Sequence, residues 1–142
     1  MLRTILEASK NFCRHQIHSE CEVKDEISTK RTLIAYIDIE TQAGNTHRVY
    51  IASDKNFMQR ISKLFLEEDE SDHETLMDMT LETTNLIVGS AKVIAEEADE
   101  NPYTIATPHF VKTDVFDFEY DQVKLIMVEN DEMLIAIKEL DV

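Results

Sequence analysis

The fold is decided by a helical run at residues 71–98, which reads SDHETLMDMTLETTNLIVGSAKVIAEEA. Apolar residues recur in this run at helical spacing and predict one long amphipathic helix with one side packed on a core. That side consists of Leu76, Met77, Thr80, Leu81, Thr84, Ile87, Val88, Ala91, Ile94, Ala95 and Ala98. Ser71 with Glu74 fits a capping box at the start of the helix, and the Glu-Asn-Pro sequence at residues 100–102 predicts its end.

A row of residues follows the opposite side of this helix, and we call it the polar stripe. Its members are Asp78, Glu82, Asn85, Gly89 and Lys92. Steps of three or four residues keep these positions within roughly 80° of arc on a helix of about 3.6 residues per turn. Asparagine is a poor helix former, and glycine costs about 1 kcal/mol relative to alanine in a helix interior. Asn85 and Gly89 therefore indicate a use outside the helix itself.

The residues of the polar stripe leave more than one use open. Acidic side chains at four-residue spacing are frequent on solvated helix faces. Two carboxylates one turn apart, Asp78 and Glu82, are also the residue types of a general acid–base pair. The Asn85 carboxamide can donate and accept hydrogen bonds and so hold a water molecule without ionising. A glycine such as Gly89 lets the backbone of a partner approach closely.

The composition limits the classes of protein and partner. The chain has 142 residues, 43% of them hydrophobic, with two glycines and two prolines, which predicts one folded domain over residues 1–142. The net charge of −15 would repel nucleic acid and anionic membrane surfaces. No apolar run is long enough for a membrane span, and the N-terminus lacks the pattern of a signal peptide. We therefore expect a cytoplasmic protein.

The N-terminal part predicts a packing helix at residues 2–19, with an apolar face that includes Cys13. Cys13, His15, His18 and Cys21 are metal-ligating residue types. On a helix, however, the Cys13 side chain faces the core while those of His15 and His18 point roughly the other way. We therefore expect reduced thiols and no metal site in this chain.

The middle of the chain predicts a hairpin and a second helix. Residues 31–40 alternate with period two, turn residues follow at 42–45, and residues 46–52 resume strand composition, which indicates an antiparallel hairpin. Ser53 and Asp54 are candidate caps for a helix. Its apolar residues are Phe57, Met58, Ile61, Leu64 and Phe65. The acidic run at 67–72 is expected to be a solvated connector.

The C-terminal part is rich in strands. The predicted strands cover residues 103–111, 115–120, 123–128 and 133–140, with a turn at Asn130 and Asp131 between the last two. The whole pattern predicts the α+β class: a largely antiparallel sheet with two long helices packed on one face and an additional N-terminal helix.

The spacing around the polar stripe resembles a family motif. Asp78, Glu82 and Asn85, with Pro108 after a further twenty-two residues, resemble the D/S-x3-E-x2-N-x22-P pattern of the CheC, CheX and FliY chemotaxis phosphatases. The run at residues 85–92 is similar to the N-x3-G-x2-K continuation in that family. One copy of the motif is present, as in the single-site CheX type.

This resemblance implies a protein phosphatase that hydrolyses the aspartyl phosphate of a CheY-type response regulator and so ends a chemotaxis signal. Asn85 is then expected to orient the attacking water, and Glu82 to pair with a lysine of the regulator. The residues expected to support partner binding or the neighbouring loop are Asp78, Gly89, Lys92 and Pro108. Mg²⁺ is expected in the regulator, and no cofactor in this chain.

Two alternatives and one further expectation accompany this interpretation. A non-catalytic binding module would dock a response regulator or a flagellar switch component through the same helix. A hydrolase built on Asp78 and Glu82 would need a concave pocket. The alternating strands at 123–128 and 133–140 imply a sheet edge that must be covered or paired, and CheX-type relatives pair sheets between subunits. We therefore expect a homodimer.

Overall fold

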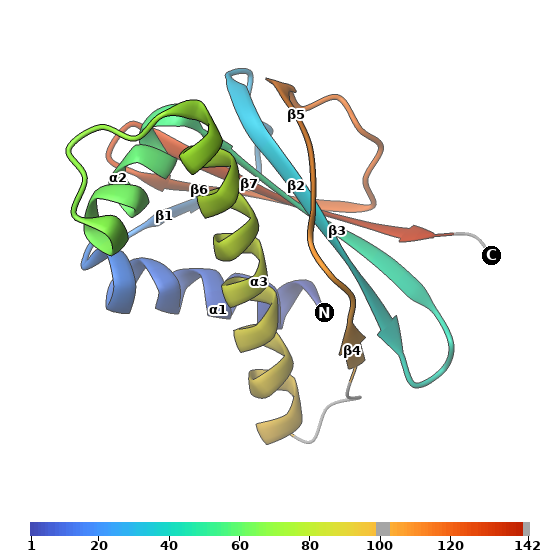
Figure 1. Ribbon diagram of the computed structural model, residues 1–142. Coiled ribbons are helices and arrows are strands. Elements are labelled where there is room, and N and C mark those ends of the chain that lie inside the picture. Colours follow the sequence, from blue (N-terminus) through green and yellow to red (C-terminus); the bar gives the residue numbers. More distant parts are fainter. Residues whose placement is uncertain (99–102, 141–142) are drawn as a thin grey trace.

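A seven-stranded sheet forms the middle of the molecule, and helices cover one of its faces (Figure 1). The computed structural model describes residues 1–98 and 103–140. Its helical elements are α1 (Leu2–Phe12), the π-helical turn η1 (Cys13–Ile17), α2 (Lys55–Leu66) and α3 (His73–Glu97). Its strands are β1 (Glu22–Lys24), β2 (Arg31–Thr41), β3 (Thr46–Asp54), β4 (Tyr103–Ile105), β5 (His109–Val115), β6 (Gln122–Val128) and β7 (Asp131–Leu140). The predicted α+β class is confirmed.

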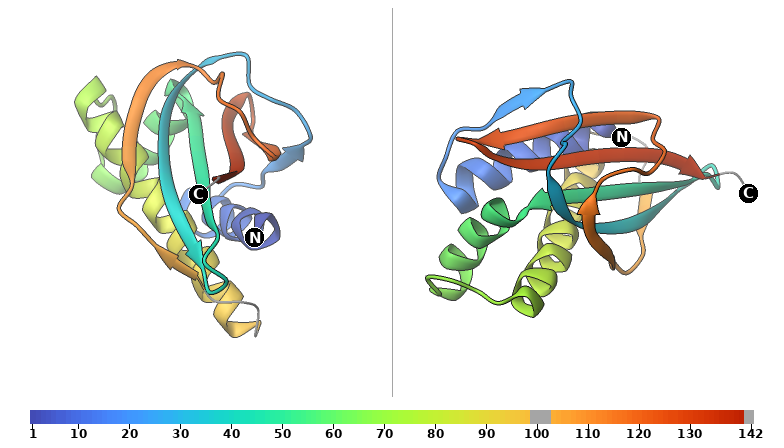
Figure 2. Two further views of the ribbon diagram at one scale, coloured as in Figure 1. Left: turned by 90° about the vertical axis from the view of Figure 1, so that its right-hand side faces the viewer. Right: turned by 90° about the horizontal axis from the view of Figure 1, so that it is seen from above.

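The strands follow the order β1-β6-β7-β3-β2-β4, and β5 pairs with the same side of β2 as β4 does. Every pair is antiparallel. The two views of Figure 2 show that the sheet is strongly twisted and that the helices lie together on one side of it. In none of the described ranges is a helix long and apolar enough to cross a bilayer.

The predicted hairpin is confirmed as β2 and β3. Tyr36 lies opposite Tyr50 in its register, and Gly44 in the turn has a φ of 87°. That left-handed conformation carries no steric cost for glycine, so the turn sequence fixes the register of the two strands.

The sheet is buried on both faces, and its alternating residues divide between two cores. On the helix side, Leu33, Ile37 and Ile39 of β2 join residues of all the helices. On the other side, Ile34 joins a smaller apolar cluster that includes Tyr50 and Phe116. The period-two pattern of β2 therefore reflects two different cores and not a core and a solvated face.

The segment after β5 covers the smaller apolar cluster on the side of the sheet away from the helices. Residues 115–120 were predicted to form a strand, but β5 ends at Val115 and residues 116–120 pair with no described strand, so this prediction is wrong. The rings of Phe116 and Phe118 instead lie 5.3 and 5.1 Å from the ring of Tyr50. The alternating phenylalanines belong to a loop that packs one of its sides on the sheet. Their spacing is the same as in a hydrogen-bonded strand, so the sequence does not distinguish the two.

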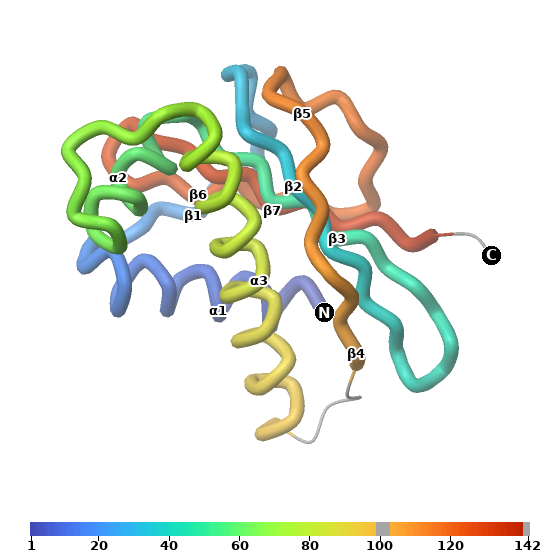
Figure 3. The backbone as a smooth tube through the Cα atoms, in the orientation of Figure 1, coloured from blue at the N-terminus to red at the C-terminus, as the bar shows by residue number. Residues whose placement is uncertain are grey.

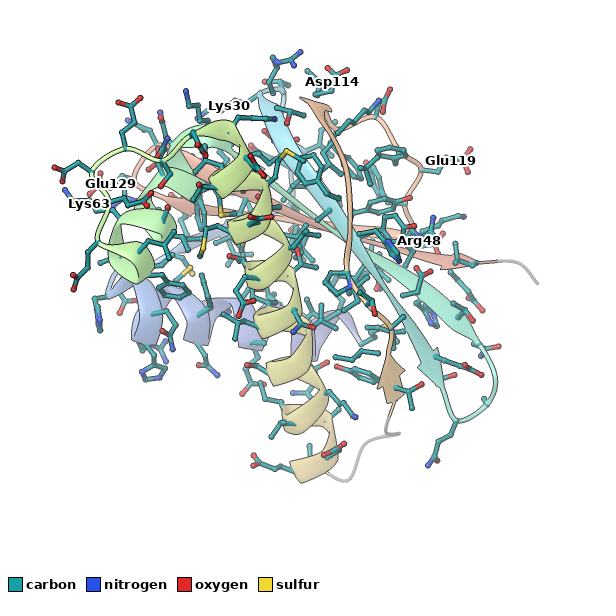
Figure 4. All side chains as sticks on the ribbon, viewed as in Figure 1. Lys30, Arg48, Lys63, Asp114, Glu119 and Glu129 are labelled. Atoms are coloured by element: carbon teal, nitrogen blue, oxygen red, sulfur yellow. The ribbon has the colours of Figure 1, made fainter. Side chains whose placement is uncertain are left out.

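An arginine completes the outer face beside this aromatic group. Arg48 donates to both carboxylate oxygens of Asp38, at 2.8 and 3.0 Å, and its guanidinium carbon lies 3.9 Å from the centre of the Tyr36 ring. Figure 4 shows Arg48 on this side of the molecule, away from the helices. The hydrogen bonds to Asp38 raise the pKa of Arg48, so the guanidinium stays charged.

The two long helices begin at aspartates. Asp54 caps α2 by accepting from the backbone N–H of Phe57 at 2.7 Å, which confirms one of the predicted caps. Asp72 caps α3 by accepting from Thr75 N–H, so the capping box predicted at Ser71 is wrong. Ser71 does not cap α3 because its polar groups have other partners. Its hydroxyl forms a hydrogen bond with Ser62 and donates to Glu68, and its backbone N–H donates to the side-chain oxygen of Gln59.

Several boundaries differ from the prediction. The N-terminal helix changes into a π-helical turn at Cys13 and ends at His18, whose φ is 61°. The short strand β1 was not predicted. The last hairpin turns at Glu129 and Asn130, one residue earlier than expected. The end signal predicted for α3 at residues 100–102 lies outside the described residues.

Candidate functional site

Helix α3 carries the candidate site and is held against the sheet by its apolar side. Its buried residues are Leu76, Met79, Thr80, Thr83, Thr84, Ile87, Val88, Ala91 and Ala95. The predicted apolar side is largely confirmed, although Met77, Leu81 and Ile94 are only half-buried and Ala98 is exposed. Because this side faces the core, the opposite side of α3 faces solvent.

Threonines on the buried side satisfy their hydroxyls locally. Thr80 donates to the carbonyl of Leu76 at 2.7 Å, and Thr84 donates to the carbonyl of Thr80 at 2.8 Å. A buried hydroxyl without a partner would be costly, and these bonds within the helix remove that cost. The polar residues on the core side therefore need no role in a site.

The polar stripe lies on the solvent side of α3 as the spacing predicts. Asp78, Glu82 and Asn85 are exposed, and Gly89 and Lys92 are half-buried. Within residues 1–98 and 103–140, the side chains of Asp78, Glu82, Asn85 and Lys92 make no hydrogen bond or ion pair. The carboxylates and the carboxamide are thus free to meet a partner molecule.

Packing within the chain does not explain Gly89. A Cβ added there would meet no heavy atom within 4 Å, apart from its own helix backbone and chain neighbours. The glycine therefore lowers helix stability without relieving a steric clash in this chain. Open space above Gly89 is consistent with the approach of another molecule.

Lys92 lies at the C-terminal end of the stripe, next to a depression of about 520 Å³. The depression lies between α3 and the end of β2, and its lining includes Glu40, Glu96 and Tyr103. Burial raises the pKa of the Tyr103 hydroxyl, which therefore stays neutral at physiological pH. Lys92 thus lines the same depression as two acidic residues, Glu40 and Glu96.

Pro108 comes from a different element. It lies in the short connection between β4 and β5, where the backbone N–H of Ala106 donates to the carbonyl of Asp38 at 2.9 Å. Both strands contact α3, and Figure 3 shows them running beside this helix. Pro108 therefore lies in a loop next to α3.

The cysteines and histidines near the N-terminus lie apart from the polar stripe. Cys13 is buried, whereas His15 and His18 are exposed, as predicted. Burial, with Cys21 as its neighbour, raises the pKa of Cys13 to about 12, so its thiol is protonated and unreactive. Among the described residues, no group of three potential ligands converges.

Two apolar residues beside the stripe were not singled out from the sequence. Leu86 is 38% exposed and Val93 is 49% exposed, whereas the other large apolar residues of α3 are buried or half-buried. Their spacing of seven residues puts them on the same side of the helix, next to Asn85 and Gly89. The sequence does contain a signal for them, because Leu86 and Val93 are large apolar residues that lie outside the predicted apolar side of the helix.

Comparison with known proteins identifies the family. The family described as "Chemotaxis phosphatase CheX" matches residues 34–130. The solved chemotaxis protein CheX from Vibrio vulnificus has a TM-score of 0.80 and 18% identity, with 98% of each chain covered. CheX from Desulfovibrio desulfuricans has a TM-score of 0.74 and 16% identity, with 97% of each chain covered.

A third similar structure is the CheX-CheY-BeF3-Mg²⁺ complex from Borrelia burgdorferi. It has a TM-score of 0.70 and 15% identity, with 97% of each chain covered. No curated protein matches the chain. These structures show the same fold, and the family match extends over more than half of the 142 residues. The chain therefore belongs to the CheX family of chemotaxis phosphatases.

Proposed function

We propose that this protein removes the phosphoryl group from the aspartyl phosphate of a CheY-type response regulator. The observation that carries the proposal is the exposed pair Glu82 and Asn85, which belong to the polar stripe of α3 and lack partners among the described residues. Support comes from the family and from the Borrelia relative, which forms a complex with CheY, BeF3 and Mg²⁺. A CheY-type substrate implies that the protein acts in the cytoplasm.

The chemistry is divided between the two proteins. In the regulator, Mg²⁺ and a lysine stabilise the charge of the acyl phosphate, so the phosphatase need supply little charge stabilisation of its own. A positioned water is what the regulator lacks. The Asn85 carboxamide would hold a water in line with the phosphorus–oxygen bond to be broken. The water attacks phosphorus, the aspartate carboxylate leaves, and inorganic phosphate is released.

Glu82 would fix the position of α3 on the regulator. It lies three residues from Asn85, so the two side chains point to the same side of α3. A carboxylate there can pair with the lysine beside the acyl phosphate, and this charge pair is protected from water when the two proteins dock. Glu82 would thus direct Asn85 toward the phosphorus.

The remaining residues would support docking. Gly89 would allow the backbone of the regulator to come close, because nothing in this chain fills the space above it. Asp78 and Lys92 would extend the charged contact along the ridge in both directions. Pro108 would set the shape of the loop beside α3.

We also propose a homodimer. The outer edge of β6 is covered by β1, whereas β5 pairs only with β2 among the described strands. Antiparallel pairing of two copies about Thr113 would put Val111 opposite Val115 and Lys112 opposite Asp114. Apolar residues and opposite charges would then face each other across the two-fold axis, as an isologous contact requires.

A turnover assay tests the proposed activity. The chain is added to a CheY-type regulator from the same genome, phosphorylated with a small phosphodonor and Mg²⁺, and loss of phosphate is followed. Faster loss than in the regulator alone is expected. Binding to the regulator without faster loss of its phosphate would favour the non-catalytic binding module, which would use the same polar stripe.

A further inference from the structure

A groove lies between α1, η1 and α3, directly beside the polar stripe. It has a volume of about 200 Å³, and its lining includes Asn11 and Phe12 of α1, His15 and Gln16 of η1, and Leu86 and Ser90 of α3. Leu86 and Ser90 directly follow Asn85 and Gly89 in the sequence. The groove therefore opens next to the residues that would meet the acyl phosphate.

The groove differs in charge from its surroundings. The chain has a net charge of −15, and the adjacent stripe carries Asp78 and Glu82. No aspartate, glutamate, lysine or arginine lines the groove. Phe12 and Ile87 form buried parts of its wall, and the Phe12 ring lies 6.2 Å from that of Phe65 in an edge-to-face contact. An uncharged, apolar group fits a rigid wall of this kind.

The size of the groove favours a side chain over a small ligand. Sites for small molecules usually measure about 300–1,000 Å³, and this groove is smaller. Leu86 at its rim and Val93 two turns further along are the exposed apolar residues on this side of α3. A pocket without acidic side chains, lysine or arginine, with an apolar rim and polar neighbours, is the usual form of an anchor site in a protein–protein contact.

The irregular backbone of η1 contributes to the groove. A π-helical turn inserts an extra residue per turn and re-aims the side chains that follow, and such turns are frequent at functional sites. Here His15 and Gln16, which are consecutive residues of η1, both line the groove. The match to the CheX family covers residues 34–130 and does not include η1.

We propose that the groove receives an apolar side chain of the response regulator and thereby selects which regulator is accepted. This inference rests on the proposed function. The polar stripe would meet the active site of the regulator, and the groove would meet an adjacent surface residue. Leu86 and Ser90 lie within roughly 8 Å of Asn85 along the helix axis, at 1.5 Å per residue. A suitable regulator therefore carries an exposed apolar residue close to its phosphorylated aspartate.

Two substitutions with opposite effects on the groove test this inference. Leu86→Ser removes the apolar rim, and Ser90→Phe fills the groove while removing only a hydroxyl. Both residues are exposed, so folding is expected to survive. Leu64→Ser on α2 is the matched control, because Leu64 is also exposed, at 44%, and lies outside the groove.

The measurement is the Kd for the regulator held in its phosphorylated form with beryllofluoride and Mg²⁺, beside steady-state turnover. Leu86→Ser and Ser90→Phe are each expected to raise Kd about tenfold, the scale of an apolar side chain that loses its buried site. The loss of turnover should lie in KM, because the contact exists before and during the reaction. Leu64→Ser should leave Kd unchanged.

An unchanged Kd in both groove variants would overturn the inference even if the wild-type chain is an active phosphatase. A change in oligomeric state without a change in Kd would also overturn it, and would assign the groove to a second copy of the chain. Absence of turnover in the wild-type chain would refute the proposed function instead. The binding titration is independent of that result.

Discussion

At the scale of single residues, the polar stripe contains two residues, Asn85 and Gly89, that do not favour the stability of the helix. Asn85 is mid-helix, exposed and without a partner among the described residues, and Gly89 has open space where a side chain would fit. Both residues lower the stability of α3 relative to alanine. A site that binds another protein explains them, because a water-holding carboxamide and a close backbone approach are useful only in the complex.

Gly89→Ala is therefore expected to separate stability from function. Because the added methyl group meets nothing in the chain, the free energy of unfolding should rise by up to about 1 kcal/mol. Affinity for the phosphorylated regulator should fall, because the same methyl group keeps the partner backbone away. Urea denaturation and a binding titration measure the two effects. A variant that gains stability and keeps its affinity would show that nothing approaches this position.

Glu82→Ala is expected to weaken binding and turnover together. If Glu82 pairs with a lysine that loses its water on docking, removal of the carboxylate leaves that charge unpaired, at a cost of about 2–5 kcal/mol. Glu82→Lys should bind more weakly still, because it brings like charges together. Titration against the beryllofluoride-bound regulator measures both variants. Equal affinity in wild type and Glu82→Ala would exclude the charge pair.

At the scale of elements, local sequence rules predict some parts and fail for others. The position of α3, the β2–β3 hairpin and the polar stripe were predictable, because helical spacing, turn residues and alternation are local signals. Three features were not predictable, because each depends on a contact outside its own segment. The loop at 116–120 packs on Tyr50, strand β1 pairs with β6, and the backbone of Ser71 bonds to Gln59. The groove was missed for the same reason, since α1 and α3 form it together.

Asp54 connects several elements, so its loss is expected to lower stability. It is buried, caps α2, and also accepts from the backbone N–H of Glu132 and from Lys30. Asp54→Ala removes all of these bonds and should lower the free energy of unfolding by about 2 kcal/mol or more. Thermal or urea unfolding measures this change. Asp54→Asn, which keeps the capping oxygen, should recover part of the loss.

At the scale of the whole molecule, the edge of the sheet formed by β5 can pair with a second copy. The outer side of β5 has no partner among the described strands, and unpaired edges are usually covered or used. The stripe residues Asp78, Glu82 and Asn85 of α3 are exposed to solvent in the single chain. A dimer through β5 would join the sheets of the two subunits edge to edge.

A charge exchange on β5 tests the dimer. Lys112→Glu should weaken association, because it would place a carboxylate opposite Asp114 of the second copy. The double variant Lys112→Glu with Asp114→Lys should restore association, since the opposite charges return in exchanged positions. Sedimentation velocity over a range of concentrations measures the association. A wild-type chain that remains monomeric at tens of micromolar would exclude the dimer.

The account depends most on Asn85, and its most direct test compares binding with turnover in one variant. For Asn85→Ala, the rate at which the phosphorylated regulator loses phosphate should fall by roughly 10²-fold or more, the scale of one positioned catalytic group. Its Kd for the beryllofluoride-bound regulator should stay close to that of the wild-type chain. Asn85→Asp, of nearly the same size, serves as the control for the lost amide. An unchanged rate, or a rise in Kd as large as the loss of rate, would contradict the role of Asn85 as the residue that holds the attacking water.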